Sequence, residues 1–196
     1  MQFKKIIPGL FHWFKQILLV LLIAIGISVL LFQTYDINDV SMEPTFEPHG
    51  NRVLVFLAPY HFNTIPDHED IIIVDSRVDK NRTFWDKFID SPLVSIVLGE
   101  HNEHLWVKRV IGLPGDELEF KDGKVYRNGQ ALEEGYVRAE MRSEFETTVV
   151  PDDHIFVMGD NRNRSSDSRD IGPIPVDNIQ GRVVLRFFPF NKFSTY

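Results

Sequence analysis

The residue with the strongest chemical implication is a lysine inside an apolar segment. Lys108 lies in the run LWVKRVI, residues 105–111, which ends at the breakers of the sequence GLPG. A short apolar run bounded by glycine and proline predicts a buried β-strand. Because side chains alternate across a strand, Trp106, Lys108 and Val110 are expected on one face, and their neighbours on the other.

Burial would change the chemistry of this amine. If its face points into an apolar interior, desolvation lowers the lysine pKa from a reference of about 10.4, at a cost of about 1.4 kcal/mol per unit. A neutral amine can act as a general base, which gives such a costly arrangement a use. The alternative is that the ammonium extends to the edge of the sheet and remains solvated.

Two other segments carry groups that could take part in chemistry. Ser41 begins the segment SMEPTF, in which Pro44 favours an extended backbone at Glu43. Taken alone, such a serine is a turn residue. The segment GDNRNRSSDSRD, residues 159–170, is dense in hydrogen-bond donors and acceptors and follows a short apolar run. Its alternating charges also fit a solvated loop that satisfies its own polar groups.

Several familiar catalytic templates are absent from the sequence. The 196 residues include no cysteine, which excludes disulfides, thiolate metal sites and a cysteine nucleophile. There is no G-x-S-x-G, S-x-x-K, H-E-x-x-H, P-loop or G-x-G-x-x-G motif. His101 and His104 stand beside glutamates, which favours surface histidines over a metal pair. His154 could pair with Ser41, but nothing near it singles it out.

The net charge of −7 is unevenly distributed along the chain. Residues 1–15 carry lysines and no acidic residue, so the remainder is more acidic than the whole. An acidic body argues against nucleic acid as the main partner.

The N-terminal part predicts a membrane anchor. From Ile17 to Phe32 every residue is apolar, glycine or serine, and flanking aromatics can extend this run of 16 toward the span of about 20 that a bilayer requires. A cleaved signal peptide and a buried core helix are the alternatives. Lysines precede the run and aspartates follow it. We therefore expect a cytoplasmic segment at 1–15, a transmembrane helix at 16–35 and an extracytoplasmic body at 36–196.

The body is expected to be mainly β, with antiparallel strands. Short apolar runs lie at 53–57, 71–74, 105–111, 155–158 and 183–188. The dipeptides Asp122-Gly123 and Asn128-Gly129 predict tight turns, the first of them closing a hairpin between 117–121 and 124–128. Residues 131–150 show no clear period. The aromatic segment at about 80–104 is read as an insertion that either contacts lipid or forms a satellite core.

The segments SMEPTF, VKRVIGLPGD and GDNRNRSSDSR, in this order behind one N-terminal anchor, resemble the type I signal peptidases (leader peptidases) of bacteria. The similarity runs from the anchor to GRVVLRFFPF near the end and leaves out residues 80–104. It implies a mainly antiparallel β catalytic domain, a plasma-membrane location and a serine endopeptidase that needs no metal or cofactor. The expected partners are the lipid bilayer and the signal peptides of exported preproteins, cleaved after small residues.

The resemblance also implies residue roles. Ser41 would be the nucleophile and Lys108 its neutral general base, with Ser165 orienting the amine by a hydrogen bond. Asp167 and Arg169 match a salt bridge that shapes the polar loop, and Asp160 and Arg162 match positions of less defined role. Apolar walls that admit only alanine-sized groups are expected from Ile37, Met42, Phe46 and Val107.

One position departs from the family pattern. The residue two before the nucleophile is usually glycine or serine and helps to form the oxyanion hole, whereas here it is Asp39. A carboxylate near a developing oxyanion is repulsive. A catalytically impaired homologue that binds signal peptides or a secretion partner is therefore the alternative function. A self-cleaving repressor of the SOS type shares the catalytic pair, but residues 1–40 leave no room for its DNA-binding domain.

Overall fold

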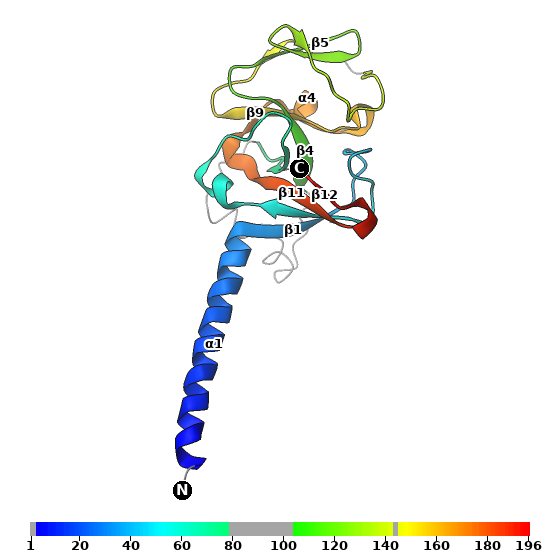
Figure 1. The fold of residues 1–196 in the computed structure, drawn as a ribbon. Helices are drawn as coiled ribbons and strands as arrows, with labels where there is room; N and C mark the ends of the chain where they lie inside the picture. The colour runs from blue at the N-terminus through cyan, green and yellow to red at the C-terminus, as the bar shows by residue number, and fades with distance from the viewer. Residues whose placement is uncertain (1–2, 79–103, 143–144) are drawn as a thin grey trace.

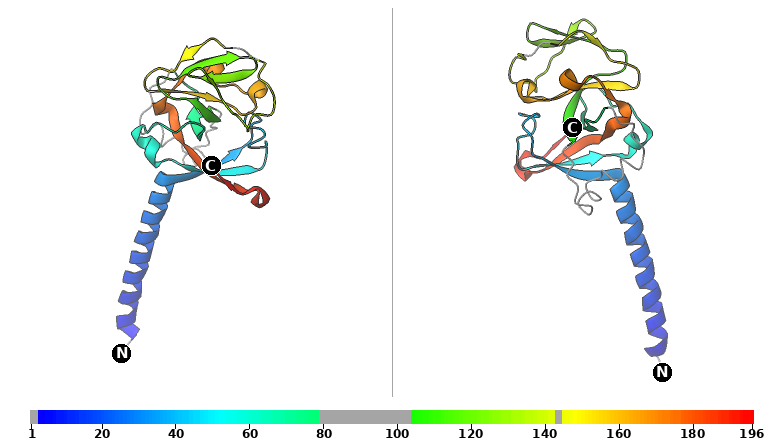
Figure 2. Two further views of the ribbon diagram at one scale, coloured as in Figure 1. Left: turned by 45° about the horizontal axis from the view of Figure 1, so that its top comes forward. Right: turned by 180° about the vertical axis from the view of Figure 1, so that it is seen from behind.

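The computed structural model describes residues 3–78, 104–142 and 145–196. A long N-terminal helix projects from a β body in which a small sheet lies over a larger one (Figures 1 and 2). The mainly β, antiparallel body is therefore confirmed. The expectations for the insertion, including that for His101, fall on residues 79–103 and lie outside the described residues.

The N-terminal helix α1 spans Phe3–Leu31. The anchor predicted for residues 16–35 is therefore too long at its C-terminal end, because β1 (Phe32–Ile37) starts at the next residue and pairs with β2 (Asn51–Phe56). Within the part of the chain that the structure describes, no helix has the length and apolar character taken to mark a membrane crossing. The membrane anchor therefore stays a prediction.

The large sheet has the strand order β1-β2-β11-β3-β4-β9-β10, and β12 pairs with β11. All of its described strand pairs are antiparallel. Its remaining strands are β3 (Ile71–Asp75), β4 (Leu105–Gly112), β9 (His154–Met158), β10 (Ile174–Pro175), β11 (Ile179–Phe188) and β12 (Ser194–Thr195).

Strand β4 lies between β3 and β9, and the sheet is covered on both faces there. Trp106 and Val110 pack in one apolar cluster, together with Ile72 of β3. Val107 packs in a different cluster with Ile73. The alternation predicted for this strand is thus confirmed, and it follows that Lys108, paired with Ile72, is held on the Trp106 face.

The small sheet has the order β7-β6-β5-β8. Its strands are β5 (Glu117–Lys121), β6 (Lys124–Arg127), β7 (Gln130–Ala131) and β8 (Thr148–Val149). Both predicted turns are confirmed: Asp122, Gly123, Asn128 and Gly129 all have positive φ. In the segment without a clear period, the regular elements among the residues that the structure describes are β7 and β8, and each has two residues.

Two predicted elements differ from the structure. The last predicted strand, 183–188, begins four residues earlier in β11, because Gly181 and a bulge allow the chain to continue along β3. The polar segment 160–170, expected as a loop, contains η2 (Arg162–Arg164) and the start of α4 (Ser168–Ile171). The other short helices among the described residues are η1 (Ala58–Phe62), η3 (Val176–Asn178) and η4 (Phe190–Lys192).

Gly181 allows close contact between β11 and β2, and this generates a stability prediction. A Cβ at this position would lie 2.7 Å from the Phe56 carbonyl oxygen and 2.7 Å from Val55 Cγ1. Gly181→Ala should therefore lower the free energy of unfolding by about 1–3 kcal/mol. Chemical denaturation of the full chain in detergent, followed by tryptophan fluorescence, measures this. Gly135→Ala is the control, because its Cβ would meet nothing within 4 Å. Equal stability of the two variants would contradict the packing described.

Candidate active site

The segment that follows β1 carries Ser41 and is fixed by apolar anchors. Met42 and Phe46 are almost fully buried in the cluster that also holds Ile37. The Phe46 N–H donates to the Met42 carbonyl at 2.8 Å, which closes a turn around them. Ser41 itself is only 3% exposed. The backbone on both sides of the hydroxyl is therefore held by the core.

Lys108, on strand β4, reaches Ser41, which lies on the segment that follows β1. The Lys108 Nζ lies 2.8 Å from the Ser41 Oγ, and the lysine is 2% exposed. The alternative in which the ammonium extends into solvent is therefore wrong. The amine also lies 5.4 Å from the centroid of the Trp106 ring, on the same face of β4. Two residues 67 positions apart thus form one buried amine–hydroxyl pair.

The electrostatic surroundings of the amine act in opposite directions. Burial is the largest influence and lowers the pKa of Lys108 from its ordinary value, with a smaller contribution in the same direction from Arg169. The nearby carboxylates, Asp167 first, then Asp39 and Asp160, act to raise this pKa. The net shift is downward, so removal from water outweighs the carboxylates. The site therefore favours the neutral amine that proton abstraction requires.

Ser165 does not contact the lysine as expected. Its hydroxyl donates to Asp167 Oδ2 at 2.8 Å, and the contacts of the described residues include no hydrogen bond between Ser165 and Lys108. Asp167 lies two residues further along and competes successfully for the hydroxyl proton. Ser165 nevertheless lines the same pocket as Lys108. The expected hydrogen bond to the amine is therefore not formed in this structure, and a role of Ser165 in orienting Lys108 stays a prediction.

Asp167 organises the polar segment. It forms an ion pair with Arg169, with Nε–Oδ1 at 2.8 Å and Nη2–Oδ2 at 2.9 Å, and it accepts the Gly159 N–H at 3.0 Å. It also caps α4 through a reciprocal bond with Asp170. Burial alone would raise the pKa of Asp167, but the Arg169 contacts hold it below its usual value. The carboxylate is therefore ionised and fully partnered.

Gly159 lies at the closest approach between this segment and the nucleophile. A Cβ there would lie 2.5 Å from the Ser41 carbonyl oxygen and 2.6 Å from Ser165 Cβ. Next to it, the Asn161 N–H donates to the Ser41 carbonyl at 2.9 Å, and the Asn161 side chain donates to the Val40 carbonyl at 3.1 Å. The polar segment thus fixes the main chain of the nucleophile.

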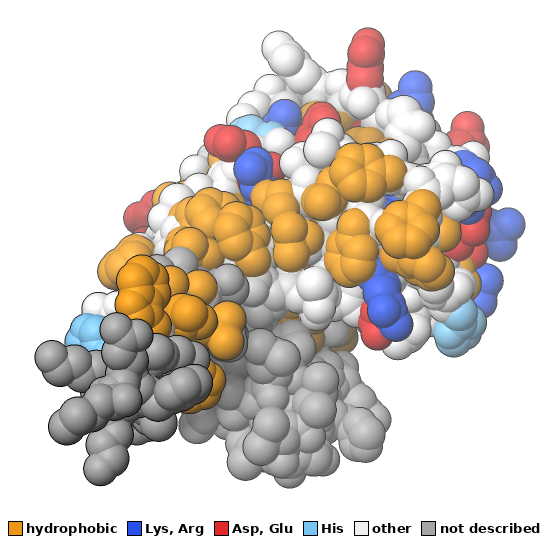
Figure 3. Space-filling model, turned by 60° about the horizontal axis from the view of Figure 1, so that its bottom comes forward, with side chains coloured by type: hydrophobic (Ala, Val, Ile, Leu, Met, Phe, Trp, Pro, Cys, Tyr) orange, Lys and Arg blue, Asp and Glu red, His pale blue; other side chains and the backbone are white. Residues whose placement is uncertain are grey.

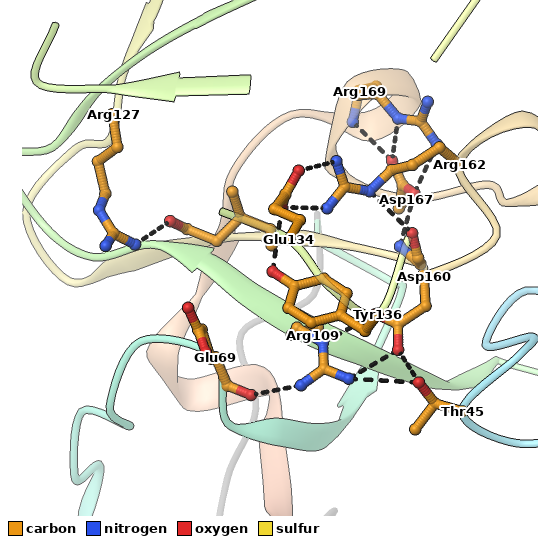
Figure 4. Close-up of polar contacts among 12 residues, drawn as sticks. Thr45, Glu69, Arg109, Arg127, Glu134, Tyr136, Asp160, Arg162, Asp167 and Arg169 are labelled. Atoms are coloured by element: carbon orange, nitrogen blue, oxygen red, sulfur yellow. Dashed lines mark hydrogen bonds and ion pairs between the residues drawn. The ribbon is translucent and has the colours of Figure 1, made fainter. Parts of the chain in front are cut away.

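Asp160 links the nucleophile segment to β4. It accepts from Arg109 Nε at 2.8 Å and Nη2 at 2.7 Å, and from the Thr45 hydroxyl at 2.5 Å (Figure 4). Arg162 pairs with Glu134, and the Arg109 guanidinium lies 3.9 Å from the centroid of the Tyr136 ring. Thr45 lies within the motif SMEPTF and Arg109 within VKRVIGLPGD. No sequence pattern predicts that both contact the same carboxylate, that of Asp160. Glu134 and Tyr136 were missed because their segment has no period or motif.

A pocket of about 530 Å³ opens at the lysine of the Ser41–Lys108 pair and is called the dyad pocket below. Its lining comprises Asp39, Trp106, Lys108, Asn163, Arg164, Ser165 and Ser166. Asp39 is exposed, and one of its carboxylate oxygens accepts the Val40 N–H at 2.7 Å. The carboxylate that departs from the family pattern therefore lines the same pocket as Lys108 and is turned in part toward the backbone of the next residue.

The four apolar residues expected to line a substrate pocket lie together, and three of them are buried. Ile37, Met42 and Phe46 are buried in one cluster, against which Val107 packs. None of the four belongs to the lining of the dyad pocket. Their role as pocket walls stays a prediction.

Of the three histidines considered in the sequence, the two that the structure describes, His104 and His154, contact other groups than Ser41 and Lys108. His104 Nε2 lies 3.8 Å from Asp75 Oδ2, and His154 Nδ1 lies 2.8 Å from the Asp152 carbonyl oxygen. Lys108 is thus the base candidate that the fold brings to Ser41.

Comparison with known proteins identifies the family. The model of the family described as signal peptidase, peptidase S26, matches residues 10–188. The chain is 35% identical to the probable signal peptidase I-1 of Synechocystis sp., over 96% of this chain and 89% of the relative. It is 36% identical to signal peptidase I of Leptolyngbya laminosa, over 92% and 80%. Against signal peptidase I of Bacillus licheniformis the identity is 33%, over 94% and 91%. The chain therefore belongs to the signal peptidase family, peptidase S26, and is a signal peptidase of type I, which is a serine endopeptidase.

Proposed function

We propose that the chain removes signal peptides from exported preproteins by means of a Ser41–Lys108 dyad. The observation that carries this proposal is the 2.8 Å contact between the Lys108 Nζ and the Ser41 Oγ in a site where both residues are nearly inaccessible. The distance is within hydrogen-bond reach, which is the first requirement for a nucleophile and its general base.

The chemistry follows from a neutral amine. The Ser41 Oγ attacks the scissile carbonyl carbon while its proton passes to the Lys108 Nζ, which becomes an ammonium. That proton then moves to the leaving amide nitrogen as the C–N bond breaks, which leaves an acyl-enzyme and a neutral lysine. Water gives a proton to the same amine, attacks the ester, and the proton returns to Ser41. Each cycle ends with the starting protonation states.

The polar segment holds the two groups in register. Asp167, paired with Arg169, accepts from Ser165 and from the Gly159 backbone, and Gly159 lies against Ser41. These residues are positioning groups in the proposal. Asp160, through Arg109 and Thr45, ties the nucleophile segment to the lysine strand.

The proposed substrate is an extended peptide with small residues before the cleaved bond. Signal peptides present such residues at alternate positions after an apolar stretch. Alternate side chains of an extended segment point the same way, so shallow apolar pockets can select for small groups. Ile37, Met42, Phe46 and Val107 are the proposed walls, which leads to cleavage after Ala-x-Ala-like sequences.

We propose that α1 anchors the enzyme in the plasma membrane, with residues 1–15 in the cytoplasm and the β body outside. The helix stands apart from the body (Figure 1), and its large apolar side chains between Trp13 and Ile23 are 43–69% exposed. Apolar side chains also gather on the face of the body seen from the helix side (Figure 3). Exposed apolar residues outside the helix include Phe32, Phe188, Phe190 and Phe193. Such surface needs an apolar environment.

A second function is favoured by one observation. Asp39 lies in the dyad pocket, and a carboxylate near a developing oxyanion opposes acylation. The chain would then be an impaired homologue that binds signal peptides or a secretion partner without rapid cleavage.

The dyad is tested by single substitutions. Ser41→Ala removes the nucleophile and Lys108→Ala removes the base, so each should lower kcat for preprotein cleavage by at least ~10³-fold without loss of folding. Lys124→Ala, at an exposed position, is the control and should leave kcat unchanged. Cleavage at the normal rate by either dyad variant would rule out the mechanism.

The same assay separates the two functions. An impaired homologue would bind preprotein without cleaving it and would gain a large rate on Asp39→Gly. An active peptidase cleaves with Asp39 in place, and at a pH above the lysine limb, where the amine is already neutral, the substitution then changes the rate little.

The pH dependence of kcat reports the lysine. Because the neutral amine is the active form, kcat should rise with pH through a limb that lies below the ordinary lysine pKa of 10.5. The Asp39 carboxylate raises the pKa of Lys108, so Asp39→Asn should move this limb to lower pH. Asp36→Asn is the matched control, since Asp36 pairs with Arg52 outside the pocket. A limb at the position of free lysine, or one that Asp39→Asn moves upward, contradicts the assignment.

The anchor is tested by charge insertion. Arginine at the centre of a membrane helix costs about 2.5–3.5 kcal/mol, so the double variant Leu21→Arg/Leu22→Arg should lose most of its association with vesicles. Val149→Arg, at an apolar position that is 60% exposed on the small sheet, should stay bound. The measurement is vesicle flotation after alkaline washing. Release of the unsubstituted chain by the wash would show that no segment is inserted.

A further inference from the structure

We propose that Glu134 and Tyr136, which lie between β7 and β8, are positioning residues for the Ser41–Lys108 dyad. Together they are called the Glu134–Tyr136 clamp. Through the clamp, the segment between two strands of the small sheet takes part in catalysis. Neither Glu134 nor Tyr136 belongs to the lining of the dyad pocket. The inference rests on the proposed dyad chemistry.

The first half of the clamp is an ion pair. Glu134 accepts from both terminal nitrogens of Arg162, Nη1 at 2.8 Å and Nη2. The side chains are 10% and 2% exposed respectively. The Arg162 Nε donates to the Gly159 carbonyl at 3.1 Å. Loss of the carboxylate would leave a buried cation unpaired, and the Arg162 side chain would have to shift toward solvent. Its hold on Gly159 would shift with it.

The second half of the clamp is an aromatic contact. The Tyr136 hydroxyl donates to Glu134 Oε1 at 3.0 Å, and the Tyr136 ring faces the Arg109 guanidinium at 3.9 Å. Burial, and then the Glu134 charge, raise the pKa of Tyr136, so its hydroxyl remains a donor. Arg109 in turn makes two bonds to Asp160. Figure 4 shows Glu134 between Arg162 and the Tyr136 hydroxyl, with the Tyr136 ring beside Arg109.

Both halves end on residues that hold the nucleophile. Gly159 lies against the Ser41 backbone, Asp160 accepts from Thr45, and the N–H of the next residue, Asn161, donates to the Ser41 carbonyl. Ser41 is on an irregular segment, whereas Lys108 is fixed within a strand. The position of the hydroxyl relative to the amine therefore depends on residues 159–161. A misplacement of about 1 Å can cost ~100-fold in rate.

A positioning role differs from a merely stabilising one. If the clamp only stabilises the fold, its loss lowers the fraction of folded enzyme but leaves kcat per active site unchanged. If it positions the nucleophile, kcat per active site falls while KM, set by the peptide pockets, changes little. The two are separated by counting active sites with the burst of acyl-enzyme formation.

The main variant is Glu134→Gln in the full chain, with Glu133→Gln, an exposed neighbour, as matched control. We expect kcat per active site for preprotein cleavage to fall about 10–100-fold in Glu134→Gln, with KM within about threefold. Glu134→Asp should recover part of the loss, because it restores the charge. Tyr136→Phe keeps the ring over Arg109 but loses the bond to Glu134, so its decrease should be smaller.

Equal kcat per active site in Glu134→Gln and Glu133→Gln would overturn the inference. If Glu134→Gln does not fold, Tyr136→Phe decides, and an unchanged kcat there overturns it as well. Hydrogen exchange of the Asn161 amide gives a readout that is independent of cleavage: it should accelerate in Glu134→Gln and not in Glu133→Gln. Absence of cleavage by the unsubstituted chain would refute the proposed function, whereas unaltered Asn161 exchange in Glu134→Gln would refute the clamp.

Discussion

The structure depends on keeping one lysine amine out of water and within reach of one serine hydroxyl. Lys108 is almost completely buried, and its Nζ meets the Ser41 Oγ at 2.8 Å. Each unit by which burial lowers the lysine pKa costs about 1.4 kcal/mol in differential interaction. The central strands offset that cost: β4 is paired on both sides, and apolar clusters cover both faces of the sheet around it. A lysine at the end of a mobile segment would be solvated instead of buried.

Burial outweighs the surrounding charges in setting the direction of the Lys108 pKa shift. Asp167, Asp39 and Asp160 would each favour the ammonium. Two of them are paired with arginines, Asp167 with Arg169 and Asp160 with Arg109, so their fields at the amine are partly compensated. Among the described residues, Asp39 forms no ion pair with a basic side chain. It is therefore the carboxylate whose replacement most directly tunes the base. The same ion pairs also hold the irregular segment that carries Ser41. One set of residues therefore both positions the serine and limits the negative field at the lysine amine.

The sequence predicts the strands and turns better than the contacts between segments. The lysine strand, its alternation and both tight turns follow from local patterns, because apolar runs and Asp-Gly or Asn-Gly pairs constrain the chain locally. The predicted anchor at 16–35 includes the first part of strand β1, since aromatic residues at a membrane boundary and in an edge strand look alike. The motifs identify Ser41 and Lys108, but the choice of Asp167 over the amine by Ser165 depends on geometry. Glu134 and Tyr136 lie in a segment with neither period nor motif, and only the fold brings them to Arg162 and Arg109.

The protonation state of one side chain tests the central claim most directly. The side-chain nitrogen of Lys108 can be followed by ¹⁵N NMR titration of the full chain in detergent and assigned by its loss in Lys108→Met. The structure predicts that this nitrogen becomes a neutral amine at a pH where the exposed lysines are still ammonium, because burial lowers its pKa. Titration of Lys108 at the ordinary lysine pKa of 10.5 would contradict the buried neutral base.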